Sequence, residues 1–177
     1  QTEFRDWVQQ RPADDLHHYE LIHGRIVMSP GAAFGHGRSG AAILAALHQH
    51  VSRHGRGAVL DASTTYELPS GDTVEPDVSF LSRAKLAAAP PDPDRFVQLV
   101  PDLVVEILSP STAARDRGEK KDLYARNGVR EYWLVDHRCR RVTVFHLRGQ
   151  AYDAGVLVTA GRVPSEVLPD LELQIDA

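Results

Sequence analysis

The sequence predicts an α/β fold of the α+β type, in which a mixed β-sheet is flanked by helices. Residues 103–108 form a continuous apolar run that is typical of a strand covered on both faces. A segment with helical periodicity follows it, and a second apolar run comes next at 131–136. Short predicted strands and a few helices make up the remainder, which favours layers of sheet and helix. We predict one domain spanning residues 1–177.

The other elements are assigned in chain order. A short amphipathic helix is predicted near the N-terminus, over 2–10, followed by a tight β-hairpin over 19–28. A long helix is expected over 36–54, ending at the Gly55-Arg56-Gly57 stretch. Further strands are predicted at 58–60, 64–68, 75–81, 141–147 and 152–158, and residues 166–175 close the chain. The segment 86–94, rich in Ala and Pro, is either a surface loop or a short helix followed by a loop.

The helix after the central strand determines which lysine faces the sheet. Asp116 is predicted to be its N-cap, with Glu119 completing a capping box, and Asn127-Gly128 is predicted to end it. Within these limits one helical face carries Lys120, Leu123, Tyr124 and Asn127. The apolar members make this the inward face. Lys120 is therefore expected to point towards the sheet, whereas Lys121 lies about 100° round the helix.

Three carboxylates stand in predicted strands: Glu20, Asp77 and Glu106. An ionised carboxylate inside an apolar strand such as that of Glu106 is costly to bury unless it is paired or binds a metal. Strands can bring together residues that are far apart in sequence, and clusters of carboxylate oxygens select hard cations such as Mg²⁺ or Mn²⁺. With an inward lysine beside them, these carboxylates predict a metal-dependent site for phosphodiester hydrolysis.

Several motifs resemble those of a known family, the Uma family of restriction endonucleases, within the PD-(D/E)xK nuclease superfamily. The resemblance covers nearly the whole chain and is most specific between Glu106 and Asp136. The matching residues are Tyr19-Glu20-Leu21 with Gly24, Glu75-Pro76-Asp77-Val78, Val105-Glu106-Ile107-Leu108-Ser109-Pro110-Ser111-Thr112, Asp116, Lys120, Tyr124, Gly128-Val129 and Glu131-Tyr132-Trp133-Leu134-Val135-Asp136.

The resemblance implies a restriction-endonuclease-like fold with a magnesium-dependent site. By position, Asp77 and Glu106 would bind the metal, the Ile107 carbonyl would add a ligand, and Glu20 would be a further ligand or would orient water. In the plain signature a lysine stands two residues after the glutamate, but that position is Leu108 here. The resemblance suggests that the lysine has moved to the following helix, and the helical periodicity independently selects Lys120.

A local basic patch is the expected contact surface for DNA, because the net charge of −4 gives the chain no general attraction for nucleic acid. The patch comprises Arg115, Arg117, Lys120, Lys121, Arg126 and Arg130. From it we predict Arg117 and Lys121 as substrate-binding residues. His36 and Tyr124 are added as residues that would reach the substrate, although both are also explained as core residues.

Simpler interpretations exist for each candidate. Glu106 could be a core carboxylate paired with Lys120 or Arg117, and Asp77 could bond its own turn after Pro76. Glu20 precedes the hairpin turn and could be exposed. The coincidence of the three carboxylates, rather than any one of them, carries the hypothesis.

Three functions remain open from the sequence. The first is a metal-dependent DNA endonuclease, for which a homodimer is expected because cutting both strands requires two sites. The second is an inactive nuclease-like module for binding or assembly, and the third is an acid/base hydrolase that uses Glu20 and Glu106 on a small molecule. The single cysteine, Cys139, excludes an internal disulfide. No stretch approaches a transmembrane span, so we expect no membrane partner and a cytoplasmic location.

Overall fold

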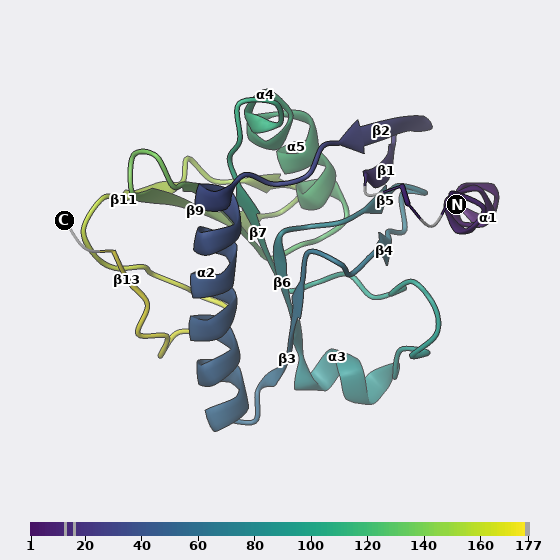
Figure 1. Ribbon diagram of the computed structural model, residues 1–177. Helices are drawn as coiled ribbons and strands as arrows, with labels where there is room; N and C mark the ends of the chain where they lie inside the picture. The colour runs from purple at the N-terminus through teal and green to yellow at the C-terminus, as the bar shows by residue number, and fades with distance from the viewer. Residues whose placement is uncertain (13, 16, 176–177) are drawn as a thin grey trace.

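The computed structural model describes residues 1–12, 14–15 and 17–175, and a mixed seven-stranded β-sheet forms its centre (Figure 1). The strands follow the order β10-β9-β8-β7-β6-β3, and β11 also pairs with β9. Their bounds are β3 (Gly57–Asp61), β6 (Val78–Ser82), β7 (Leu103–Ile107), β8 (Glu131–Asp136), β9 (Arg141–Arg148), β10 (Ala151–Tyr152) and β11 (Val156–Val158).

The central pair, β7 and β8, is parallel, whereas the other pairs of this sheet are antiparallel. A parallel pair needs a crossover, and the helical segment between the two strands supplies it. Both strands are buried on both faces, as their continuous apolar runs predict. The predicted α+β class, with a mixed sheet flanked by helices, is confirmed.

Two hydrophobic cores cover the two faces of this sheet. On one face the helix α2 (Phe34–Arg53) packs through Ile43, Leu47 and Val51 against the odd-numbered residues of β7. On the other face lies α5 (Glu119–Arg126), which contributes Leu123 and Tyr124. Because side chains alternate along a strand, Glu106 points to the α5 side, like Val104.

A second, four-stranded sheet has the order β2-β1-β5-β4 and carries the predicted hairpin. It consists of β1 (His18–Ile22), β2 (Arg25–Ser29), β4 (Tyr66–Glu67) and β5 (Thr73–Val74). Its buried residues join the core on the α5 side, so β1 lies near the helix that carries Lys120 (Figure 1). The remaining elements are α1 (Thr2–Gln9), α3 (Arg83–Ala88), α4 (Ala113–Arg117) and the pair β12 (Gly161–Arg162) and β13 (Gln174–Ile175).

Several predicted boundaries were wrong. The helix expected after β7 is interrupted at Gly118, whose backbone (φ −121°, ψ −91°) separates α4 from α5. Asp116 therefore lies inside α4 and is not the N-cap of a single long helix. Strand β6 starts at Val78, so Asp77 immediately precedes it, and the segment 152–158 is divided between β10 and β11.

The position of the long helix α2 and the C-terminal end of α5 were predicted more closely. Helix α2 covers the predicted segment and begins at Phe34, and the chain leaves α5 through Asn127 and Gly128, whose φ is +82°. In the part of the chain that the structure describes, no helix has the length and apolar character needed to cross a membrane.

Candidate active site

A cleft of about 580 Å³ lies where the N-terminal end of α2, the hairpin strand β1 and the ends of β6 and β7 converge. Four of the predicted site residues line it: Glu20, Asp77, Glu106 and Lys120. Two more of the predicted site residues, His36 and Ile107, also line it. The structure thus brings together residues that are up to 100 positions apart in sequence.

Glu106 and Lys120 form a buried ion pair at the inner end of the cleft. Lys120 Nζ lies 2.7 Å from Glu106 Oε1, and the Tyr124 hydroxyl donates to the same oxygen at 2.8 Å. Glu106 is 4% exposed and Lys120 is 3% exposed. The prediction that Lys120, and not Lys121, faces the sheet is therefore confirmed. The ion pair also satisfies the simpler interpretation of Glu106 as a core carboxylate paired with Lys120.

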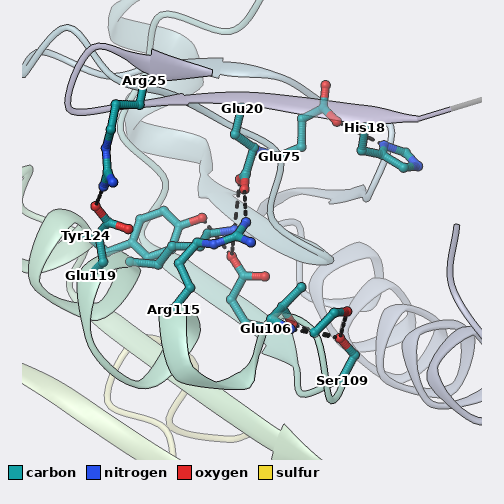
Figure 2. Close-up of polar contacts among 12 residues, drawn as sticks. His18, Glu20, Arg25, Glu75, Glu106, Ser109, Arg115, Glu119 and Tyr124 are labelled. Carbon is teal, nitrogen blue, oxygen red and sulfur yellow. Dashed lines mark hydrogen bonds and ion pairs between the residues drawn. The ribbon is translucent and has the colours of Figure 1, made fainter. Parts of the chain in front are cut away.

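Glu20 reaches the same lysine from the second sheet. Its Oε1 lies 2.8 Å from Lys120 Nζ and accepts the backbone N–H of Glu75 at 3.0 Å. Its Oε2 lies 3.8 Å from Arg115 Nη1. Figure 2 shows the Glu20 side chain extending from its strand towards Arg115, with Glu106 beyond. The lysine is thus held between two carboxylates, one from each sheet.

Asp77 stands on the other side of the cleft, at the entry to β6. Its Oδ2 accepts the backbone N–H of Ile107 at 2.6 Å and lies 3.3 Å from Nε2 of His36. The hydrogen bond to Asp77 raises the pKa of His36, burial opposes the rise, and a hydrogen bond to the Ile107 backbone adds to it. His36 therefore contacts two of the four groups that the sequence proposed as metal ligands, Asp77 and the Ile107 backbone, rather than the core alone.

Sequence reasoning missed Asp116 as a cleft residue. It is buried in α4, lines the cleft, and has a raised pKa because burial disfavours its charge. A usable signal was present, because Asp116 stands four residues before Lys120, on the helical face already taken as inward. The sequence pattern instead predicted Asp116 to be the N-cap of the helix. The cleft also contains Arg115, His137 and Arg138.

Three other predicted substrate-binding residues, among those that the structure describes, do not line the cleft. Tyr124 is fully buried behind Glu106. Lys121 Nζ lies over the ring of Phe145 at 3.9 Å, and Arg117 lines a separate hollow of about 260 Å³. The buried place of Tyr124 and the outward place of Lys121 agree with the helical periodicity, whereas Arg117 stands at the end of α4, before the break at Gly118.

Leu108 lines that separate hollow, together with Arg117 and Asp136, and is not among the residues that line the cleft. This position holds the lysine in the plain nuclease signature. Position 108 therefore borders the hollow that contains Asp136 and does not border the cleft. Placing the lysine on α5 instead allows it to reach Glu106.

The charges of the cleft are strongly coupled. Burial raises the pKa of the Glu106 carboxyl well above its usual value, and the nearby Lys120 opposes this rise. Burial lowers the pKa of Lys120, but the charges of Glu106 and Glu20 outweigh it, so that the pKa is raised. Lys120 is therefore a permanent cation at neutral pH.

Two carboxylate oxygens remain available for a cation. Within residues 1–12, 14–15 and 17–175, Glu106 Oε2 and Asp77 Oδ1 have no hydrogen-bond or ion-pair partner. The same residues contain no group of three or more His, Cys, Asp or Glu side chains arranged to hold a metal. Mg²⁺ commonly binds through one or two carboxylates and keeps several waters, so two carboxylates with one carbonyl fit this ion.

The raised pKa of Glu106 predicts a pH dependence of stability in metal-free protein. The folded state holds the Glu106 proton more tightly than the unfolded state does. The stabilisation that Glu106 gives the folded state is therefore fully present below the ordinary pKa of 4.5, and it is lost as the pH rises through the pKa of the folded state. The slope reaches at most about 1.4 kcal/mol per pH unit. Urea unfolding of wild type and Glu106→Gln in chelator, between pH 4.5 and 7, measures it.

We expect the unfolding free energy of the wild type to fall relative to that of Glu106→Gln as the pH rises. Glu119→Gln, which alters a more accessible carboxylate on α5, is the matched control and should show a much smaller trend. A wild-type minus Glu106→Gln difference that did not change with pH would contradict the burial argument.

Comparisons with known proteins give two sequence matches. A family model described as "Uma2: Putative restriction endonuclease" matches residues 2–176. A segment of 47 residues is 49% identical to "Uncharacterized protein slr1290" of Synechocystis sp.; it covers 26% of this chain and 25% of that protein.

A solved structure shares the fold. The crystal structure of "a putative nuclease belonging to DUF820" from Anabaena variabilis matches with a TM-score of 0.78, over 97% of this chain and 93% of that one. The sequence identity is 16%, so this likeness establishes the common fold and not a common substrate.

Proposed function

This chain belongs to the Uma2 family, whose model spans nearly all of it, and on that premise we propose that it is a metal-dependent endonuclease that hydrolyses DNA phosphodiester bonds. The observation that carries the proposal is the convergence of Asp77, Glu106 and Lys120 on one cleft. Each comes from a different segment of the chain, and a chance cluster would not be expected to combine a buried lysine with two carboxylates that each have an unpartnered oxygen.

The proposed metal ligands are Asp77, Glu106 and the Ile107 carbonyl. A bound Mg²⁺ or Mn²⁺ would polarise the phosphate and lower the pKa of a bound water. Asp77 is held by the Ile107 N–H at Oδ2, and Glu106 is held by Lys120 and Tyr124 at Oε1. One oxygen of each carboxylate is therefore held in place, and the other oxygen is free to bind the metal.

The electrostatics of the cleft support a requirement for a cation. Carboxylates outnumber the lysine and arginine side chains of its lining. An anionic phosphodiester would be repelled by this surface until a divalent cation offsets part of the charge. We assign Lys120 to stabilise the negative charge that develops on the phosphate when water attacks phosphorus and the bond to the 3′ oxygen breaks.

The substrate and assembly are further parts of the proposal. We assign contacts with the DNA backbone to Arg115, Arg138 and His36, which are three of the cationic or ionisable residues that line the cleft. A homodimer would supply the two sites needed to cut both strands. Arg117 and Lys121 point elsewhere, so we assign them no contact with the scissile phosphate.

The direct test combines metal titration with a cleavage assay on the same protein. Calorimetry with Mg²⁺ and Mn²⁺ should detect binding to the wild type, and plasmid and linear duplex DNA should be cut only when one of these ions is present. Excess chelator should abolish cleavage, and returning Mn²⁺ should restore it. Cleavage that persists in chelator, or a wild type that binds neither ion, would refute the proposal.

One alternative function is supported by a specific observation. Lys120 pairs with both Glu106 and Glu20, so part of the charge of these two carboxylates is offset without a metal. A nuclease-like module that binds or assembles without cutting would retain such a cluster. Stable oligomers or DNA binding in a wild type that binds no metal would favour that function.

A further inference from the structure

The catalytic lysine proposed above is placed on a helix, and a lysine side chain is long and flexible. A group outside α5 is therefore needed to hold the Lys120 ammonium in place against β7. We propose that Glu20 is a positioning residue, which holds the Lys120 ammonium against Glu106 and anchors the segment that leads to Asp77, and that it is not a ligand of the metal. This inference rests on the proposed function and deepens it.

The contacts of Glu20 leave its carboxylate little capacity for a metal. Oε1 is shared between Lys120 Nζ at 2.8 Å and the Glu75 N–H at 3.0 Å. Oε2 lies 3.8 Å from Arg115. A divalent cation bound to Glu20 would therefore lie close to two fixed positive charges, which oppose its binding. Glu106 and Asp77 also have such partners, Lys120 and His36, but each on one oxygen only, and Glu106 Oε2 and Asp77 Oδ1 have none among the described residues.

The same carboxylate connects both halves of the site. Glu75 stands two residues before Asp77, so the bond to its N–H restrains the segment that presents one proposed ligand. The bond to Lys120 restrains the proposed stabilising cation. Glu20 is 5% exposed and belongs to β1, which pairs with β5 and therefore has a fixed place in the second sheet. The carboxylate thus acts through other groups and does not need to touch the substrate.

A double-mutant cycle separates positioning from ligation. Glu20→Gln is compared in the wild-type background and in the Lys120→Met background, with single-turnover cleavage and Mn²⁺ calorimetry as readouts. We expect Glu20→Gln to lower the cleavage rate about 10²-fold, the effect of a misplacement of about 1 Å, while the Mn²⁺ affinity changes by less than about twofold. Glutamine keeps an oxygen that can accept the Glu75 N–H, so in the Lys120→Met background the same substitution should cause no further loss.

A matched control tests whether the hairpin is merely loosened. Glu119 on α5 pairs with Arg25 on β2 and so joins the same two parts of the molecule away from the cleft. Figure 2 shows this pair to one side of Glu20 and Glu106. Glu119→Gln should leave the cleavage rate and the Mn²⁺ affinity close to wild type. An equal loss in both variants would attribute the Glu20 effect to loosening and overturn the proposal.

An activity-independent readout keeps the proposal testable if no cleavage is found. The chain has three lysines, Lys85, Lys120 and Lys121, so acylation followed by mass spectrometry reports each one. Lys120 should be protected in the wild type and react several-fold faster in Glu20→Gln, with Lys121 as the internal standard. Unchanged protection of Lys120 would overturn the positioning role. A parallel fall in Mn²⁺ affinity that persists in Lys120→Met would instead make Glu20 a ligand.

Discussion

Replacement of Glu106 by glutamine is expected to remove Mn²⁺ binding and to lower the rate of metal-dependent DNA cleavage by about 10³-fold or more. Glutamine keeps the size of the side chain and an oxygen that can accept the Tyr124 hydroxyl, so the fold should survive. It removes the charge that the proposed metal requires. Calorimetry and single-turnover cleavage on the same preparation measure the two effects.

The control is a buried glutamate of the second sheet. Glu67 pairs with Arg5 and accepts from Gln98, and it does not line the cleft. Glu67→Gln should weaken the fold modestly but leave Mn²⁺ affinity and cleavage at wild-type levels. If Glu106→Gln kept a metal-dependent activity at the wild-type rate, the assignment of Glu106 as a ligand would fail, and the carboxylate would be structural.

Replacement of Lys120 by methionine is expected to have the largest combined effect on cleavage and stability. The change leaves Glu106 and Glu20 without their shared cation, and breaking a buried ion pair in this way destabilises proteins by about 3–5 kcal/mol. Protonation of Glu106 relieves part of this cost at low pH, because burial already raises its pKa. Cleavage should fall by about 10²–10³-fold, while Mn²⁺ still binds.

Two further variants distinguish a chemical from a structural role of Lys120. Lys85 pairs with the buried Asp102 far from the cleft, so Lys85→Met should lower stability without changing the cleavage rate of the folded protein. Adding Leu108→Lys to Lys120→Met should not restore cleavage, because position 108 faces the hollow with Asp136. Restored activity would show that a lysine at 108 reaches the phosphate after all.

Local sequence patterns predicted the positions that depend on periodicity. Glu106 can be identified because it is an acidic residue within an apolar run. This pattern can be read from the sequence whatever the arrangement of the strands. Lys120 was separated from Lys121 because Leu123 and Tyr124 define the buried side of the helix. Both inferences need only one element at a time, which is the level at which a single sequence is informative.

Positions that depend on how separate elements pack were predicted less well. The partner of Glu20 is decided by the contact between the second sheet and α5, which no local pattern encodes. The break at Gly118 turned Asp116 from a cap into a cleft residue and moved Arg117 to another hollow. A glycine in a short polar helix is compatible with a continuous helix and with an interrupted one. Tertiary contacts therefore determine which of the two forms.

The distance along the chain between Glu20 and Lys120 has a consequence for how the protein matures. The two residues that meet at 2.8 Å are separated by 100 positions, and Glu106 lies only shortly before the second of them. Loops of this size close late, because chain entropy must be overcome before the contact forms. During synthesis the chain therefore carries its hairpin and its long helix well before the lysine emerges. The proposed site is therefore assembled only after both the hairpin and α5 have been synthesised and have packed together.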